Sequence, residues 1–86
     1  MGDNTVTGMP TVLRIGPYRF FFYAGDRDEP QHVHVGRDNN LAKFWLSPVS
    51  LQTSGGFSVT EINRIKRLLE ENREILVGRW NEFFNG

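Results

Sequence analysis

The chain contains no cysteine, which excludes a disulfide framework, a thiol nucleophile and a cysteine-ligated zinc site. It contains no apolar run long enough to cross a bilayer, and its first residues lack the basic-then-apolar order of a signal peptide. Net charge is missing as well, because ten Lys and Arg balance ten Asp and Glu. No overall field therefore draws the protein toward nucleic acid or membrane, and charge recognition has to come from local arrangement. We expect a cytoplasmic protein with no membrane partner and no cofactor.

The residues that are present indicate a folded domain, with 38% hydrophobic, 13% aromatic and 23% charged residues. A chain of 86 residues forms one domain. A domain this small buries only about 60% of the surface that its unfolded chain exposes, so its aromatic side chains have to supply much of the core. Residues 1–8 are polar and without periodicity, which predicts a loose leader before a single domain over residues 9–86.

Two strands are predicted at residues 11–15 (TVLRI) and 18–25 (YRFFFYAG), which are rich in β-branched and aromatic residues. Gly16-Pro17 between them suits a type II′ hairpin turn. That turn fixes the register and predicts the pairs Ile15–Tyr18, Arg14–Arg19, Leu13–Phe20 and Val12–Phe21. One face, the expected core, then carries Leu13, Ile15, Tyr18, Phe20 and Phe22, and the other carries Val12, Arg14, Arg19, Phe21 and Tyr23.

Further strands follow a loop at residues 25–31, whose Gly, Asp and Pro content is typical of loops. Residues 32–35 (HVHV) alternate, which predicts Val33 and Val35 pointing inward and His32 and His34 outward. Residues 41–46 (LAKFWL) predict a strand with Phe44 and Leu46 on one face and Lys43 and Trp45 on the other. Residues 49–56 add a short edge strand.

A long C-terminal helix is predicted to begin at Ser58, which with Glu61 has the spacing of a capping box, and Phe57 with Ile62 has that of a hydrophobic staple. Its apolar stripe consists of Ile62, Ile65, Leu69, Leu76, Trp80 and Phe83. Gly78 within the stripe ends or thins the helix, or permits close packing. The expected fold is α+β, a small antiparallel sheet of three to four strands packed on one long C-terminal helix.

The segments MPTVLRIGPYRFFFYAGDRDEP, HVHV, AKFWL, SGGFS and the helix from EINRI to WNEFF resemble a small bacterial family known as domain of unknown function 4160. The resemblance runs from Met9 to about Phe84, and Gln31 stands where members often have a second proline. It implies a β-rich domain closed by a C-terminal helix, and Met9 as the native start. It also implies a neighbouring small gene, an arrangement similar to toxin-antitoxin modules. It assigns no catalytic residue.

His32 and His34 lie beside Asp26, Asp28 and Glu29 in the sequence, and as alternate strand residues they present two imidazoles to the same side. In a first interpretation they act as base and acid in RNA phosphodiester cleavage. A ligand face around them then binds phosphates and unpaired bases through Arg14, Arg19, Phe21, Tyr23, Lys43 and Trp45. In a second, they form a metal site with one of the three acids. In a third, they only face water or satisfy the acids.

The function predicted from these patterns is a toxin-antitoxin-type module component that binds RNA or a protein partner through the open sheet face, with RNA cleavage as an open possibility. The alternative is a metal-dependent hydrolase that uses His32 and His34. Phe21 needs cover on the open face, which a partner encoded nearby or a second copy in a homodimer would supply. Arg14 and Arg19 either bind an anion or pair with Asp26, Asp28 or Glu29.

Overall fold

The computed structural model describes residues 11–85. The predicted leader at residues 1–8 and the start at Met9 lie outside these residues. Within the described range, neither α-helix has the length and apolar character needed to cross a membrane.

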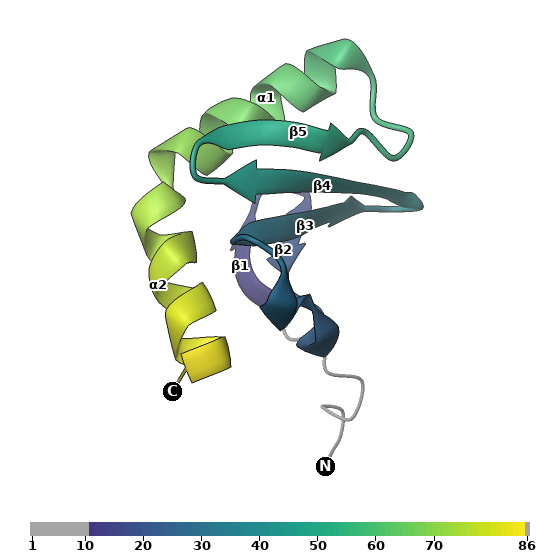
Figure 1. The fold of residues 1–86 in the computed structure, drawn as a ribbon. Helices are drawn as coiled ribbons and strands as arrows, with labels where there is room; N and C mark the ends of the chain where they lie inside the picture. Colours follow the sequence, from purple (N-terminus) through teal and green to yellow (C-terminus); the bar gives the residue numbers. More distant parts are fainter. Residues whose placement is uncertain (1–10, 86) are drawn as a thin grey trace.

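The fold is a five-stranded antiparallel sheet with two helices packed on one face (Figure 1). The strands are β1 (Thr11–Ile15), β2 (Tyr18–Phe21), β3 (His32–Arg37), β4 (Asn40–Leu46) and β5 (Val49–Thr53), and they lie side by side in chain order. A 3₁₀ helix, η2 (Ala24–Asp28), connects β2 to β3. The α+β class is confirmed, and the edge strand predicted within residues 49–56 is present as β5. The sheet has five strands, one more than the upper end of the predicted three to four.

The Gly16-Pro17 hairpin has the predicted register at three of four positions: Ile15 pairs with Tyr18, Arg14 with Arg19, and Leu13 with Phe20. Gly16 has a φ of +55°, as the first turn position of a type II′ hairpin requires. The fourth pair is wrong, because the register shifts and Thr11 rather than Val12 lies opposite Phe21. This irregularity turns Val12 away from the second face, and it packs against the core instead.

Two helices occupy the place of the single long helix that the pattern predicts: α1 (Val59–Glu71) and α2 (Arg73–Asn85). The break is at Asn72, whose side-chain amide donates to the Leu68 carbonyl at 2.8 Å. A side chain that bonds to the backbone in this way competes with the regular helix pattern. Gly78 does not end the helix; it lies inside α2, where an added Cβ would meet nothing within 4 Å, so it does not serve close packing either.

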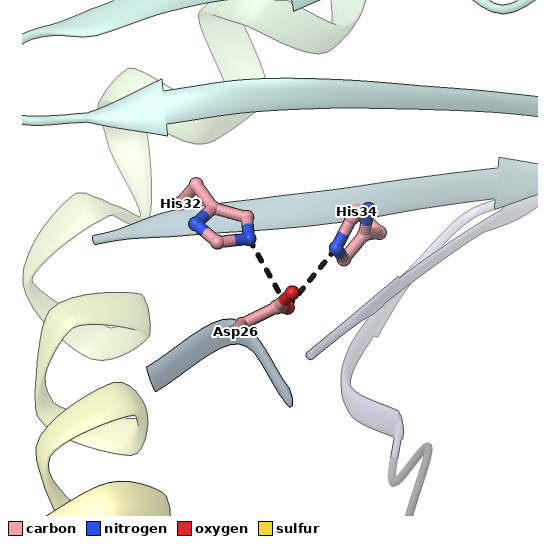
Figure 2. A group of neighbouring side chains, drawn as sticks. All are labelled: Asp26, His32 and His34. Atoms are coloured by element: carbon pink, nitrogen blue, oxygen red, sulfur yellow. Dashed lines mark hydrogen bonds and ion pairs between the residues drawn. The ribbon is translucent and has the colours of Figure 1, made fainter. Parts of the chain in front are cut away.

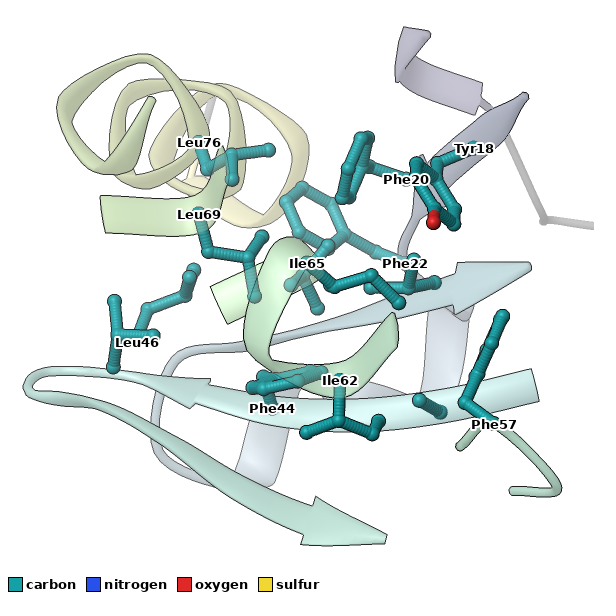
Figure 3. Close-up of a cluster of buried hydrophobic side chains, with 14 of the residues drawn as sticks. Tyr18, Phe20, Phe22, Phe44, Leu46, Phe57, Ile62, Ile65, Leu69 and Leu76 are labelled. Carbon is teal, nitrogen blue, oxygen red and sulfur yellow. The ribbon is translucent and has the colours of Figure 1, made fainter. Parts of the chain in front are cut away.

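The core lies between the helices and one face of the sheet (Figure 3). From the helices it contains five of the six predicted stripe residues, and Phe83, the sixth, is 38% exposed while Phe84 packs against the core in its place. From the sheet and the residue after β2 it contains seven predicted residues, all buried: Tyr18, Phe20, Phe22, Val33, Val35, Phe44 and Leu46. The predicted Leu13 and Ile15 are partly buried and pack against it. The helices therefore cover the hydrophobic face of the sheet, and they leave its second face available for a functional site.

The first turn of α1 is tied to the sheet by a charged contact. Ser58 caps the helix by accepting from the Glu61 backbone N–H at 3.1 Å, as predicted. The Glu61 carboxylate does not complete the capping box. It accepts a bidentate pair of bonds from Arg37 and a bond from the Tyr18 hydroxyl at 2.8 Å. α1 is thereby held against β2 and β3.

Candidate functional site

The second face of the sheet brings together the residues that the sequence selected for binding. Strand pairing places His34 between Phe21 and Lys43, and His32 opposite Trp45. The Arg19 guanidinium lies 4.5 Å from the centre of the Phe21 ring, and the Lys43 ammonium lies 4.9 Å from that of Trp45. Arg14 and Tyr23 complete the set of predicted residues.

The two histidines lie on the predicted face, opposite Val33 and Val35, but they are buried and so do not face water as the third interpretation allows. His32 is 0% and His34 8% exposed. The cause is η2, which folds over the end of the face and was expected to be an ordinary loop (Figure 2). The Trp80 ring of α2 also lies 5.2 Å from the His32 ring.

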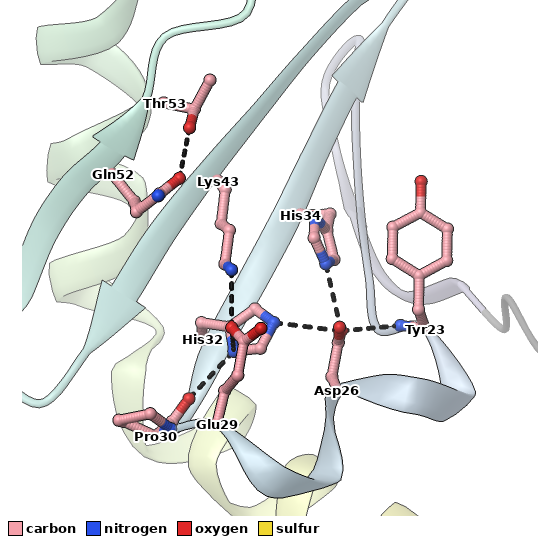
Figure 4. Close-up of polar contacts among 9 residues, drawn as sticks. All are labelled: Tyr23, Asp26, Glu29, Pro30, His32, His34, Lys43, Gln52 and Thr53. Carbon is pink, nitrogen blue, oxygen red and sulfur yellow. Dashed lines mark hydrogen bonds and ion pairs between the residues drawn. The ribbon is translucent and has the colours of Figure 1, made fainter.

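Asp26, at the centre of η2, is the residue that meets both histidines (Figure 2). Its Oδ2 lies 3.0 Å from His34 Nε2 and 3.1 Å from His32 Nε2. The same oxygen accepts a hydrogen bond at 2.8 Å from the backbone N–H of Tyr23, the residue that precedes the 3₁₀ helix (Figure 4). The ligand atoms of the three side chains all lie within 4.8 Å of one another. Of the three acids near the histidines in the sequence, Asp26 is therefore the one that lies against both rings.

The two imidazoles differ in their hydrogen bonds. His34 Nε2 donates to Asp26 Oδ2. His32 Nδ1 lies 2.9 Å from the Pro30 carbonyl oxygen, and because a carbonyl can only accept, Nδ1 carries the proton (Figure 4). His32 Nε2 makes no hydrogen bond within residues 11–85, although the Asp26 Oδ2 oxygen lies 3.1 Å from it. A fully buried ring nitrogen is thus left without a hydrogen bond at the centre of the cluster.

Burial also changes the acid–base properties of this region. It lowers the pKa of His34 more than the neighbouring Asp26 carboxylate raises it, which favours the neutral ring. Glu29, at the outer edge of the cluster, accepts a bond from Lys43 at 2.6 Å, and this bond lowers the pKa of Glu29.

Of the two alternatives for Arg14 and Arg19, the pairing with Asp26, Asp28 or Glu29 does not occur. Asp26 faces the histidines and Glu29 faces Lys43. In the part of the chain that the structure describes, Arg14 and Arg19 form no ion pair with any carboxylate. The two arginines lie opposite one another across the β1–β2 hairpin.

The arginines border a groove with a volume of about 490 Å³ between the β1–β2 hairpin and the β3–β4 turn. Phe21 and Tyr23 line one part of it, and Arg37, Asn39 and Asn40 line another. The sequence analysis missed the second group, since only the strand order brings the β3–β4 turn beside the hairpin. The pairing of Arg19 with Gly36 places the two turns at the same end of the sheet. Lys43 and Trp45 do not line the groove.

The cover that Phe21 needs comes from its own chain. Phe21 is 1% exposed, with the Arg19 guanidinium on its ring, the Tyr23 ring at 5.5 Å and the His34 ring stacked at 5.6 Å. The expectation that a partner or a second copy covers this residue is therefore wrong. Phe21 gives no reason to expect a dimer on this face, because it is not an exposed apolar residue.

Comparison with known proteins shows a family match. The family model described as domain of unknown function (DUF4160) matches residues 18–81, which begin at the first residue of β2 and end within α2. No curated protein and no solved structure matches the chain.

Proposed function

Starting from the finding that the chain belongs to the DUF4160 family of domains of unknown function, we propose that it binds single-stranded RNA through the groove beside the β1–β2 hairpin. The groove volume of about 490 Å³ is that of a site for a small ligand or one nucleotide unit, since such pockets span about 300–1,000 Å³.

The observation that carries the proposal is the opposed pair Arg14 and Arg19. Two like charges directly across a hairpin destabilise it, and within residues 11–85 no carboxylate neutralises either of them. A phosphate bound between the two guanidinium groups would relieve the repulsion and accept bidentate hydrogen bonds. Arg37, at the same groove, is already engaged by Glu61 and Asp38. The phosphate contacts therefore belong to the hairpin arginines.

The groove offers fewer surfaces for base stacking than the sequence predicts. Phe21 is covered, so a base would stack on the plane of the Arg19 guanidinium, which lies on that ring, or on the half-buried Tyr23. The carboxamides of Asn39 and Asn40 border the same groove and offer both donors and acceptors to base edges. This combination supports binding of a flexible single strand rather than of a duplex.

The experiment is a titration of the protein into a short fluorescein-labelled oligouridylate at low salt, followed by anisotropy. The test variant is Arg14→Gln/Arg19→Gln, and the matched control is Arg64→Gln/Arg67→Gln, which removes two exposed arginines from α1 on the other side of the sheet. Each phosphate contact that is lost should flatten the dependence of log affinity on log salt by about 0.7. We expect the test variant to lower affinity by about a hundredfold, or about 2.8 kcal/mol, and the control to leave it unchanged. Equal losses in both variants, or no binding by the wild type, would refute the groove as an RNA site.

The role in a toxin-antitoxin-type module is part of this proposal and rests on the family resemblance. It predicts that expression of the chain alone arrests growth, and that its neighbouring gene product relieves the arrest and co-purifies with it. Cleavage of the bound RNA by His32 and His34 stays a prediction. Because His32 is fully buried, cleavage requires at least a local opening of η2.

A metal-dependent hydrolase at His32 and His34 is the second candidate, and the observation that favours it is the convergence of Asp26 with both histidines. Its first requirement is that the cluster binds an ion, which can be tested separately from RNA binding.

A further inference from the structure

The buried Nε2 atom of His32, which makes no hydrogen bond, indicates what the cluster can bind. The proton on His32 Nδ1 is fixed by the Pro30 carbonyl, so in the neutral ring Nε2 is a bare lone pair. That lone pair lies 3.1 Å from a carboxylate oxygen, which also carries only lone pairs. Two buried acceptors this close together without a donor between them repel each other, and the Nε2 atom has lost contact with water without gaining a hydrogen-bond partner. A cation between them turns this repulsion into attraction.

The spacing of the three donor atoms fits a metal ion. An ion with bonds of about 2.0–2.2 Å to nitrogen and oxygen holds neighbouring ligand atoms roughly 3.0–3.5 Å apart, in octahedral or tetrahedral geometry. Asp26 Oδ2 lies 3.0 Å from His34 Nε2 and 3.1 Å from His32 Nε2. Both distances therefore match neighbouring ligands of one ion, and the ligand atoms of all three side chains lie within 4.8 Å of one another. Figure 2 shows both imidazoles turned toward the Asp26 carboxylate.

The surroundings of the cluster also match those of a metal site. The Pro30 carbonyl orients the His32 ring through its far nitrogen, and the Tyr23 N–H holds the Asp26 carboxylate at 2.8 Å. Outer contacts of this kind fix the tautomer of a ligating histidine and the direction of a ligating carboxylate. The side chains of His34 and Asp26 are 10% and 11% exposed, which leaves an approach from solvent, whereas that of His32 is 0% exposed.

From this geometry we infer that Asp26, His32 and His34 form a binding site for a divalent transition-metal ion, with Zn²⁺ as the best fit among common ions. Two imidazole nitrogens with one carboxylate suit Zn²⁺ and Fe²⁺, whereas Mg²⁺ and Ca²⁺ prefer oxygen ligands. Three protein ligands leave at least one position for water or another ligand. On binding, the proton of the neutral His34 ring shifts from Nε2 to Nδ1, and the ion takes its place beside Asp26 Oδ2.

The test uses the full-length, untagged chain after removal of metal with a chelator. Co²⁺ is added while its visible absorption is recorded, Zn²⁺ is then used to displace it, and Mg²⁺ serves as the contrasting ion. We expect one Co²⁺ per chain in a low-symmetry site, displacement by Zn²⁺ with submicromolar affinity, and no competition from Mg²⁺. Zinc binding weaker than micromolar, or competition by Mg²⁺ at similar concentration, would overturn the inference.

Two variants locate the ion. Asp26→Asn keeps an oxygen for the Tyr23 N–H but removes the anionic ligand, so it should weaken Zn²⁺ binding by at least about tenfold. Glu29→Gln is the matched control, because the Glu29 carboxylate lies near the same ring, 3.8 Å from His32 Nδ1, yet outside the cluster. Binding that survives Asp26→Asn, or that is lost equally in Glu29→Gln, would place the ion elsewhere.

A measurement on the wild type alone does not depend on how the variants fold. Ring-nitrogen NMR of the two histidines should show His32 protonated at Nδ1 and unprotonated at Nε2 before metal is added. On addition of Zn²⁺, both Nε2 signals should shift while His32 Nδ1 keeps its proton. A His32 ring that is doubly protonated and insensitive to Zn²⁺ would show an imidazolium–carboxylate pair instead and would refute the site.

Discussion

Replacing Asp26 by alanine tests whether η2 is anchored to the sheet as the structure indicates. The carboxylate accepts from the Tyr23 N–H and from His34 Nε2, and Asp26 and His34 are both buried. The variant leaves these two donors without an acceptor, at about 1–3 kcal/mol for each group. His32 Nε2 makes no hydrogen bond to Asp26, so loss of the carboxylate relieves the repulsion between the two acceptors and offsets part of this cost. The expected loss is therefore about 2–5 kcal/mol, out of a total stability on the order of 4–13 kcal/mol for a chain of this length.

The assay is urea unfolding at neutral pH in the presence of a chelator, so that metal binding does not contribute. Asp28→Ala is the matched control, since Asp28 lies in the same 3₁₀ helix but is exposed, and changes at such sites stay within about 0.5 kcal/mol. In thermal unfolding, the Asp26→Ala variant should melt at least about 8 °C lower. A loss below about 1 kcal/mol would show that the hydrogen bonds of Asp26 do not hold η2 in place.

Four further predictions concern the rest of the fold. Leu69→Ala removes a fully buried side chain and should cost about 2–5 kcal/mol in urea unfolding; a smaller loss would contradict the packing of α1 on the sheet. The bond from Arg37 lowers the pKa of Glu61 from 4.5, so this contact stabilises the fold above that pH and is lost as pH falls through the lower folded-state value. Stability measured across that acid range should therefore fall less steeply in Glu61→Gln than in the wild type, and identical slopes would contradict the contact. Gly55→Ala should unfold or severely destabilise the protein, because φ is +59° and an added Cβ would lie 1.6 Å from a backbone oxygen, whereas Gly78→Ala in α2 should raise stability by about 1 kcal/mol.

The local part of the fold could be predicted from the sequence because its determinants are short-range. A two-residue Gly-Pro turn fixes a hairpin register over the pairs nearest to it, and three of them are confirmed. The fourth lies beyond an irregularity for which the pattern gives no signal. Helical spacing identified the buried stripe. Periodicity could not distinguish two helices from one continuous helix, because the break at Asn72 is marked by a single side-chain hydrogen bond.

The candidate site was less accessible to prediction, because burial depends on what covers a face. Alternation placed both histidines correctly on the side opposite Val33 and Val35, but it carries no information about η2, a single short 3₁₀ turn without periodicity. The selection of Asp26 over Asp28 and Glu29 follows from that turn. The groove similarly depends on the order of the strands, which brings two separate turns to one end of the sheet.

The most direct test of the proposed function is an NMR titration of the isotope-labelled chain with a short oligouridylate at low salt. The groove predicts that the largest amide shifts fall on Arg14, Arg19, Tyr23 and the turn residues Asn39 and Asn40, and that they disappear as salt is raised. Shifts confined to α1 and α2, or no shifts at all, would contradict the claim that RNA binds on the second face of the sheet.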